Sequence, residues 1–499
     1  MCGITGVWGG VDLSLVENMM ELVKHRGPDA KGMFVSPHGP GVLGHRRLSI
    51  MDPQGGDQPI YNENRNMAII ANGEIYNFPQ LRPELAKEHE LTTTSDSEAI
   101  LHLYEDHGSS VVEHLDGMYA FVIADEDKLY AARDPIGIKP LYFAERGPAL
   151  LFASELKAFP SNCDKVREFP PGTFFHSDHG FSTFYQVPRV SSQAASVDYY
   201  ITQIKETLEK AVVKRLMSDV PLGAFLSGGL DSSIIAALAR KHLGRFHTFS
   251  VGIEGSRDLE AARLVSRYLD TIHHEYVFDE REVREKLSEI IYYLESFDQD
   301  LVRSGIPCFF TSRLAADYVK VILTGEGADE LFGGYTYYKA IVNHETLHEE
   351  LRRSVSSLHN VNLQRVDRMT MAHAIEGRVP FLDVSMIRLG QLVPPELKLV
   401  GSPVTEKWIL RKAFEDLLPA EIVWRTKEQF DEGSGTVELL KRLVTASITE
   451  DESHQYRSKY PEAKLRSAEE CHYHRLFIGA YDNPEAVLAN VARWAERPL

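Results

Sequence analysis

The stretch LSGGLDSS, residues 226–233, joins two segments of different character. The short apolar run before it, Pro221 to Leu226, is typical of a buried strand, and the run from Ser232 to His242 has helical character. Backbone N–H groups in a loop that opens a helix point to one place and favour an anion there. The familiar loop GxxxxGK[ST] ends in a lysine, whereas this stretch has Asp231. A phosphate bound here therefore needs a cation between itself and Asp231.

A second acidic loop, GEGADELFGG at residues 325–334, follows another apolar run, YVKVILTG. The carboxyl ends of parallel strands meet at one edge of a sheet, so Asp231 and Asp329 could reach one metal ion. Mg²⁺ is usually bound by one or two carboxylates together with substrate oxygens. Either loop alone could be only a capped turn, but the two together favour a magnesium site.

The composition indicates a globular protein of two or three domains. Hydrophobic residues make up 43% and charged residues 25% of the 499 positions, which is ordinary for such a chain. The formal net charge of −18 argues against nucleic acid or an anionic membrane as a partner, because those binders use a basic surface. The first residues do not resemble a signal peptide, and the four cysteines form no CxxC pair. We expect a cytoplasmic protein.

The sequence changes texture near residue 190. Before that point short β-rich runs alternate with turns, and helices are expected near residues 14–24 and 95–106, the second capped by Ser95 or Asp96. From residue 198 long helical periods alternate with brief apolar strands, which predicts a doubly wound parallel α/β sheet with a helical extension. The segment VPRVSSQAASVD (187–198) has linker composition. We predict domains at residues 1–188 and 198–499.

Cys2 becomes the N-terminal residue if the initiator methionine is removed. Its own α-amine, with an unperturbed pKa of about 8, could then accept the thiol proton. Taken alone, a cysteine at this position is more often a small buried residue. The motifs downstream decide between these interpretations.

Those motifs resemble, in order and spacing, the N-terminal-nucleophile glutamine amidotransferase domain, an αββα sandwich. They are HRGPD (25–29), RLSIMD (47–52), NGEIYN (72–77), SDSEAI (95–100), DGMYAF (116–121), RDPIGIKPLY (133–142) and SELKAF (154–159). The resemblance implies glutamine hydrolysis at Cys2, with the Asn72 side chain and the Gly73 N–H stabilising the oxyanion. The implied glutamine-binding residues are Arg47, Leu48, Ser49, Ile50, Met51, Asn72, Gly73, Glu74 and Asp96.

The second half resembles the ATP pyrophosphatases, whose pyrophosphate-binding loop is similar to SGGLDSS. The order of the two halves is that of the glutamine-hydrolysing asparagine synthetases, and the resemblance spans roughly residues 1–490. Further motifs are FSVG (249–252), EGRVPFLD (376–383), SPVTEKWILRKAF (402–414) and RTKEQFDEG (425–433). The resemblance implies that ammonia passes through a tunnel to a β-aspartyl-adenylate made from aspartate and Mg-ATP. The products would be asparagine, glutamate, AMP and pyrophosphate.

The resemblance also implies roles for residues of the second half. The ATP-binding residues would be Leu226, Ser227, Gly228, Gly229, Asp231, Ser232, Val251, Thr324 and Gly325. Asp231 and Asp329 would bind Mg²⁺, Glu326 would act as general base, and Lys427 would stabilise developing charge. Arg303, Glu330 and Arg378 are candidates for binding aspartate, and Met118 for the tunnel wall. Each weaker assignment has an alternative: Lys427 as a solvated lysine, Arg378 in a structural ion pair, Met118 as ordinary core.

One departure concerns the acceptor substrate. In SFDQDLVRSGIP (296–307) this chain has Asp300 and Leu301 where related proteins commonly have two threonines. A carboxylate at that position would repel aspartate if it touched it. A related adenylating amidotransferase that acts on another carboxylate therefore stays open, as does a non-catalytic sensor on the same fold. Retention of Cys2 argues against cyclising relatives. The oligomeric state is left open, a homodimer included.

Overall fold

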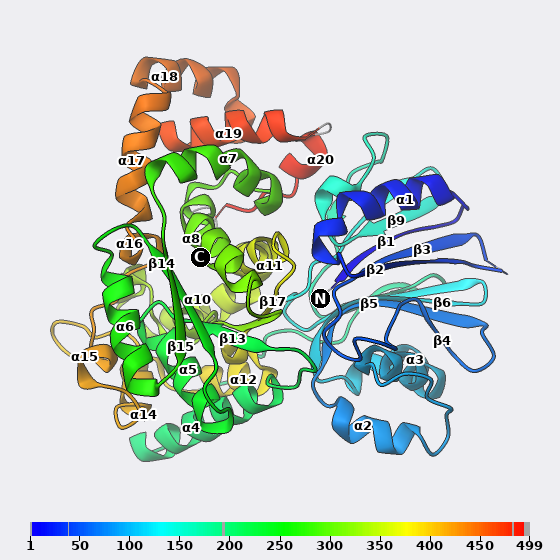
Figure 1. Ribbon diagram of the computed structural model, residues 1–499, viewed down its shortest axis with the longest axis horizontal. Coiled ribbons are helices and arrows are strands. Elements are labelled where there is room, and N and C mark those ends of the chain that lie inside the picture. The colour runs from blue at the N-terminus through cyan, green and yellow to red at the C-terminus, as the bar shows by residue number, and fades with distance from the viewer. Residues whose placement is uncertain (1, 38, 192–194, 482–483, 494–499) are drawn as a thin grey trace.

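The computed structural model describes residues 2–37, 39–191, 195–481 and 484–493, and its two halves lie side by side in Figure 1. The N-terminal half contains two six-stranded antiparallel sheets. The first has the order β10 (Arg167–Glu168), β8 (Tyr142–Arg146), β9 (Ala149–Ala153), β1 (Cys2–Trp8), β3 (Gly41–Arg47), β2 (Ala30–Val35). The second has the order β12 (Gly180–Thr183), β11 (Thr173–His176), β7 (Lys128–Arg133), β6 (Gly117–Asp125), β5 (Met67–Ile75), β4 (Ile60–Tyr61).

Helices cover the outer faces of these sheets, which gives the predicted αββα sandwich. Helix α1 (Leu13–Leu22) packs on β1 and β3, whereas α3 (Asp96–His107) packs on β5 beside α2 (Phe78–Leu85). Ser95 is the N-cap of α3, as predicted, and its side chain accepts a hydrogen bond from the Ser97 N–H. Alternating apolar residues such as Ile4, Ile70 and Val122 fill the space between the sheets. The strands therefore hold their other face against the helices.

The C-terminal half is built on one parallel sheet, also as predicted. Its order is β15 (Ile272–Val277), β14 (His247–Gly252), β13 (Leu222–Phe225), β16 (Val321–Leu323), β17 (Glu376–Arg378). The chain winds outward from β13 in one direction and from β16 in the other, so the strand order reverses between these two neighbours. In such sheets ligands bind beyond the carboxyl ends of the strands at the reversal. Both acidic loops predicted to bind the metal lie there.

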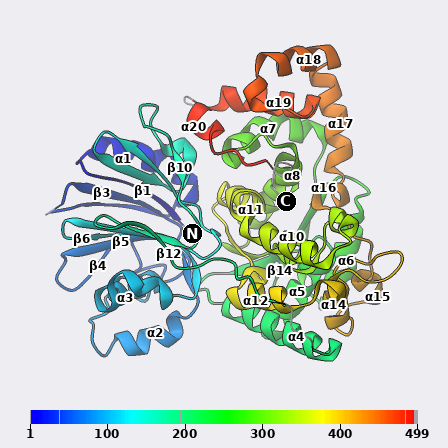
Figure 2. The same cartoon turned by 180° about the vertical axis from the view of Figure 1, so that it is seen from behind.

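Helices surround this sheet and continue beyond it (Figure 2). Those between and beside the strands are α4 (Val197–Lys214), α5 (Leu230–His242), α6 (Arg257–Leu269), α7 (Glu280–Leu294), α8 (Gln299–Ala316), α9 (Ala328–Phe332), α10 (His344–Ser356) and α11 (Asn362–Met371). The extension comprises α12 (Val384–Leu392), α13 (Pro395–Lys398), α14 (Trp408–Ala413), α15 (Ala420–Val423), α16 (Phe430–Gly433), α17 (Thr436–Ser447), α18 (Glu450–Lys459), α19 (Ala468–Ala480) and α20 (Pro484–Leu488). The stretch between β12 and α4 contains the predicted linker, of which residues 192–194 lie outside the described residues.

Buried charged residues join the two halves. The Arg26 guanidinium donates to Asp367 Oδ2 on α11 and to Glu155 Oε1, both at 2.7 Å, and its Nε donates to the Cys2 carbonyl oxygen. Arg26 has no exposed surface, so the carboxylates offset the cost of burying its charge. The first residue of β1 is thereby linked to a helix of the other half.

Candidate active site

Cys2 lies at the first position of β1, where the strand register places it opposite Arg47 of β3. The Cys2 backbone N–H donates to Asn72 Oδ1 at 2.9 Å. Asn72 is fully buried, and its Nδ2 has no hydrogen-bond partner among the described residues. A buried donor without a partner is costly unless a ligand completes it. Asn72 Nδ2 is therefore well suited to receive the amide oxygen of a substrate attacked by Cys2.

The residues around this cysteine leave little space. Gly73 follows Asn72 in β5, and a Cβ at Gly73 would lie 2.1 Å from the Met118 carbonyl oxygen, so a side chain does not fit.

Burial raises the pKa of the Cys2 thiol. A base must therefore remove the thiol proton before attack. Met1, whose removal would free the α-amine for this task, lies outside the described residues.

Two buried carboxylates lie near this nucleophile. Asp96 Oδ2 accepts a hydrogen bond of 2.6 Å from the Ile75 N–H, and burial raises the pKa of Asp96 to about 6. Burial, followed by the charges of Glu376 and Asp96, raises the pKa of Glu74 well above its usual range. One guanidinium, that of Arg378, approaches Glu74 Oε2 at 3.3 Å. The excess of carboxylate over cation favours a ligand that carries an ammonium group.

The remaining predicted glutamine-binding residues follow Arg47. Its guanidinium donates to Asp57 Oδ1 at 2.7 Å and to the carbonyl oxygens of Met51 and Asp52. Leu48 and Ile50 are buried, and the Ser49 N–H donates to Asp29 Oδ2. The loop from Arg47 onward is thus folded around its own arginine beside Cys2.

The second site is a pocket at the reversal of the parallel sheet. Loop 226–229 leads from β13 into α5, and loop 324–327 leads from β16 into α9. Gly228 has a φ of +71°, and a Cβ there would lie 2.5 Å from the Ala261 backbone, so the loop requires glycine at this position. The predicted residues that line the pocket are Leu226, Ser227, Gly229, Asp231, Ser232, Val251, Thr324, Gly325, Glu326, Asp329 and Lys427.

A lysine ammonium lies between the two acidic loops. Lys407 Nζ is 2.5 Å from Asp231 Oδ2 and 2.5 Å from Asp329 Oδ1, and Lys427 Nζ is 2.9 Å from Asp329 Oδ2. Burial opposes the charge of Asp329, but the two lysines outweigh it and hold the pKa of Asp329 well below its usual range. Lys407 immediately precedes α14, within the quoted motif SPVTEKWILRKAF, but no role was predicted for it. The sequence feature that could have indicated a role for Lys407 is its position inside this recognisable motif.

These residues fit a divalent cation. Asp231 Oδ1 is buried and has no hydrogen-bond partner among the residues that the structure describes. Asp231 and Asp329 converge on one point, where Lys407 Nζ now balances their charge. Mg²⁺ bound together with a nucleotide commonly takes one or two carboxylates as its protein ligands. Here two carboxylates meet at the edge of the pocket.

Glu326, the predicted general base, forms an ion pair with Arg365 of α11. Glu330, the residue after Asp329, accepts hydrogen bonds from the Tyr335 hydroxyl at 2.5 Å and from Asn362 Nδ2. Burial, and then the charge of Asp329, raises the pKa of Glu330 to about 7. Glu330 lies behind the loop and not on the pocket wall.

The other two residues predicted to bind aspartate, Arg303 and Arg378, are not among the residues that line this pocket. Arg378 is fully buried on β17, where its guanidinium contacts Glu376, Glu74 and the Arg215 and Met217 carbonyl oxygens. Arg378 therefore adjoins the glutamine-binding residues of the other half. Arg303 is paired with Glu469 of α19. Asp300 and Leu301 do line the pocket, and Asp300 is 3.3 Å from Arg466.

Comparison with known proteins agrees with this division of the chain. Residues 1–180 match a family model described as "Glutamine amidotransferase domain", and residues 203–347 and 339–487 match one described as "Asparagine synthase". The chain is 40% identical over 505 residues to asparagine synthetase (glutamine-hydrolyzing) of Zea mays, covering 96% of this chain and 86% of that one. It is 42% identical over 461 residues to asparagine synthetase (glutamine-hydrolyzing) 2 of Arabidopsis thaliana, covering 87% and 79%.

A solved structure, glutamine phosphoribosylpyrophosphate amidotransferase from B. subtilis, shares 21% identity with a TM-score of 0.33, covering 51% of this chain and 67% of that chain. None of the helices in the described part of the chain is both long and apolar enough to span a membrane. The identity to the curated relatives extends over both halves and most of their length. The chain belongs to the glutamine-hydrolysing asparagine synthetase family.

Proposed function

We propose that the chain hydrolyses glutamine at Cys2 and uses the ammonia to convert aspartate to asparagine with Mg-ATP. The observation that carries the synthetase half is the convergence of Asp231 and Asp329 on one cation in a pocket that also contains Glu326. Opposed carboxylates at an anion-binding loop are unfavourable unless a cation and a phosphate chain complete the site.

The first half-reaction follows from the geometry at Cys2. The thiolate attacks the side-chain amide carbon of glutamine, and negative charge develops on the amide oxygen. Asn72 Nδ2, which has no partner within the described residues, and the Gly73 N–H are the donors that stabilise this charge. Ammonia leaves, and water then hydrolyses the thioester to release glutamate. Glu74 and Asp96 bind the ammonium group of glutamine, and Arg47 binds its carboxylate.

Ammonia reaches the other half through apolar surroundings. Met118 has no exposed surface and belongs to a buried cluster with Tyr76 and Ile136 of the first half and Val379 of the second. An apolar lining favours neutral NH₃ over the ammonium ion, because a charge is costly to bury. This cluster supports a passage between the two sites.

The second half-reaction uses the pocket at the sheet reversal. The loop Ser227–Ser232 binds the phosphates, and Leu226, Val251, Thr324 and Gly325 contact the nucleoside. Mg²⁺ held by Asp231 and Asp329 supplies charge neutralisation when bound. The β-carboxylate of aspartate attacks the α-phosphorus and pyrophosphate leaves. Ammonia then attacks the acyl carbon of the adenylate, Glu326 accepts a proton from the attacking nitrogen, and Lys427 stabilises the developing negative charge. The acyl–oxygen bond breaks, and AMP leaves.

A different carboxylate acceptor is the second candidate, because Asp300 lines the pocket. Its charge is partly balanced by Arg466, and it could instead pair with a cationic group on the acceptor. An acceptor with an ammonium group near Asp300 would form this second ion pair. Aspartate, whose α-ammonium meets that requirement, stays the first choice.

Incubation of the protein with glutamine, Mg-ATP and single carboxylic acids tests the proposal. Pyrophosphate and the amide product are measured for each acid. We expect pyrophosphate release with aspartate and formation of asparagine in equal amount. Release only with another acid would support the second candidate, and no release with any acid would contradict both.

A further inference from the structure

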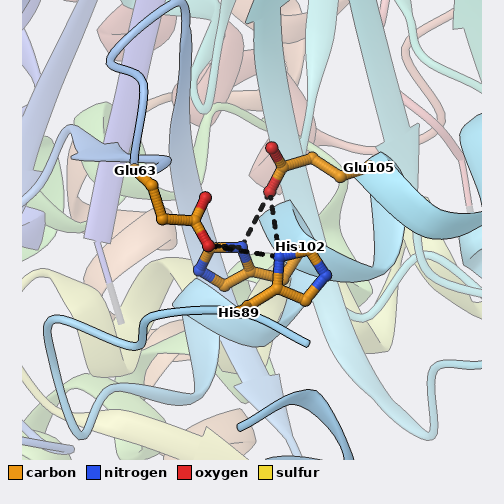
Figure 3. A group of neighbouring side chains, drawn as sticks. All are labelled: Glu63, His89, His102 and Glu105. Carbon is orange, nitrogen blue, oxygen red and sulfur yellow. Dashed lines mark hydrogen bonds and ion pairs between the residues drawn. The ribbon is translucent and has the colours of Figure 1, made fainter. Parts of the chain in front are cut away.

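Four metal-ligating side chains cluster outside both sites (Figure 3). Glu63 follows β4, His89 lies between α2 and α3, and His102 and Glu105 are on α3. One ligand atom from each of the four lies within 4.8 Å of the others. In Figure 3 the two imidazoles and two carboxylates face a common point. Nothing in the two half-reactions uses these residues.

The distances between these atoms match a tetrahedral metal site. His89 Nδ1 is 3.2 Å from Glu63 Oε1 and 3.7 Å from Glu105 Oε2. His102 Nδ1 is 2.8 Å from Glu105 Oε2 and 3.9 Å from Glu63 Oε1. Ligands about 2.0–2.2 Å from a tetrahedral Zn²⁺ are about 3.3–3.6 Å from one another. Four of the six distances thus lie within about 0.5 Å of the tetrahedral range, and all six are below 4.8 Å.

A carboxylate lies on the outer side of each imidazole. His89 Nε2 is 3.2 Å from Asp106 Oδ1, and His102 Nε2 is 3.8 Å from Glu98 Oε1. Histidine ligands of metals usually direct their other ring N–H to a carboxylate in this way, which fixes the tautomer and the ring. Asp106 thus holds the His89 ring with Nδ1 toward the common point. His102 Nε2 is too far from Glu98 for a hydrogen bond, and the His102 ring is held instead by the contact of its Nδ1 with Glu105 Oε2 at 2.8 Å.

The outer groups are themselves held in place. Glu98 accepts hydrogen bonds from the backbone N–H and the hydroxyl of both Thr92 and Thr93. The second oxygen of Glu105 accepts from Asn62 Nδ2 at 2.8 Å. The His102 side chain is only 1% exposed, so one ligand is rigidly buried. Such preorganisation is what a metal site needs and exceeds that of an exposed acidic cluster.

We propose that Glu63, His89, His102 and Glu105 bind one divalent transition-metal ion of the Zn²⁺ type. Two imidazole nitrogens and two carboxylate oxygens are a ligand set that suits Zn²⁺ better than Mg²⁺ or Ca²⁺, which prefer oxygen. All four positions come from the protein, which indicates a structural site and not a catalytic one. The ion would fasten the loop that carries His89 to α3, whose first residue is Asp96 of the glutamine site.

Cobalt provides the direct test, because tetrahedral Co²⁺ absorbs visible light strongly. Purified full-length protein is stripped with a chelator and titrated with Co²⁺ in excess Mg²⁺, and Zn²⁺ is then added. We expect one Co²⁺ per chain with a tetrahedral spectrum, displacement by Zn²⁺, and a higher melting temperature in the metal-bound state. Absence of one-to-one binding, or an octahedral spectrum only, would overturn the proposal.

Variants locate the ion. His89→Ala should abolish the tetrahedral spectrum and the Zn²⁺-dependent rise in melting temperature, and Asp106→Asn should weaken binding about 10–100-fold. The matched control is His179→Ala, in the second group of possible ligands, His176, Asp178 and His179. That variant should bind like the parent chain. If it loses the ion while His89→Ala keeps it, the site lies elsewhere and the assignment fails. Glu105→Gln replaces His89→Ala if the latter does not fold.

Discussion

The two catalytic halves balance their buried charges in opposite ways. At the glutamine site the Arg378 guanidinium contacts Glu376 and lies 3.3 Å from Glu74, and burial raises the pKa of the Glu74 and Asp96 carboxyl groups. At the nucleotide site Lys407 and Lys427 meet Asp329, and its pKa is held low. The ammonium group of glutamine would add positive charge beside the Glu74 and Asp96 carboxyl groups of the first site. The second already contains cations and awaits an anion, which the triphosphate would supply.

The halves also differ in how they hold their residues. Cys2 and Arg47 lie on paired strands of one sheet, and Asn72 and Gly73 lie on a strand of the other, so strand register and the packing of the two sheets together set their spacing. Asp231, Asp329, Lys407 and Lys427 come from four segments that follow strands or belong to the helical extension. A strand ladder positions groups through backbone hydrogen bonds, whereas the second site depends on ion pairs between distant segments. We therefore expect substitutions at the first site to lower activity alone. Substitutions at the second site should also lower the free energy of unfolding.

The strongest test of separate halves is Cys2→Ala. Glutamine-dependent synthesis should fall by on the order of 10⁴-fold or more, because the nucleophile is lost. Synthesis with added ammonium salt should stay within about twofold of the parent chain, since Cys2 contacts nothing in the nucleotide pocket. Asparagine is measured with each nitrogen source. Loss of both activities would show that the halves do not act separately.

Glu326→Gln should give the converse result. Asparagine formation with either nitrogen source should fall about 10²–10⁴-fold, because the general base is removed. Glutamine hydrolysis, measured as glutamate, should persist. Normal asparagine output from this variant would remove Glu326 from the mechanism. Glu415→Gln, in an exposed pair with Lys412, serves as the control and should keep both activities.

Asn72→Ala tests the oxyanion donor of the first half. We expect a decrease of about 10²–10³-fold in kcat for glutamine hydrolysis, with a smaller change in KM, because the donor acts mainly on the transition state. Ammonia-dependent synthesis should be unaffected. An increase in KM alone would instead assign Asn72 to binding glutamine in its ground state.

Lys407→Met tests whether ion pairs between distant segments stabilise the second site. Removing one member of a buried ion pair costs about 3–5 kcal/mol in the free energy of unfolding, because the partner charges are left unbalanced. Mg²⁺ should restore part of this loss by taking the place of the ammonium, and it should raise the melting temperature of the variant more than that of the parent. Lys412→Met is the matched control on α14 and should change neither quantity. Equal Mg²⁺ responses would contradict a metal site between the carboxylates.

The smallest expected effect is a pH dependence of glutamine binding. The pKa of Asp96, raised to about 6, means that this carboxyl takes up a proton as the pH falls through 6 and then no longer attracts an ammonium group. The KM for glutamine should rise about tenfold per pH unit below that value. The raised pKa also means that Asp96 favours folding below its ordinary pKa and that this contribution is lost as the pH rises from about 4 to about 6. Asp96→Asn should flatten both profiles.

Local features of the sequence predicted much of this molecule. Glycine and serine between an apolar strand and a helix predicted the loop at 226–233, and Ser95 predicted the start of α3, because capping and turn formation involve neighbouring residues. The αββα sandwich came from resemblance and not from periodicity. Strand β17 was missed, since two of its three residues are charged and periodicity favours no strand there.

The surroundings of the residues predicted to bind aspartate depend on contacts between segments that are distant in the sequence. Local sequence patterns do not reveal such contacts. Arg378, predicted either to bind aspartate or to form a structural ion pair, lies buried against Glu376 and Glu74. Arg303 pairs with Glu469, which is 166 positions away in the chain. The four-residue cluster around His102 was likewise unseen, because its members belong to three segments that only folding brings together.

The amino-acid sequence by itself determined the order of the two halves, the chemistry of Cys2 and the two acidic loops. The acidic loops depend on residue type within short segments, whereas the order of the halves and the role proposed for Cys2 came from the resemblance of successive motifs along the chain. Only the tertiary structure decided what lies between Asp231 and Asp329, because Lys407 is 176 positions from Asp231. Electrostatic energy depends on distance in space and on burial, and neither quantity can be read from separation along the chain.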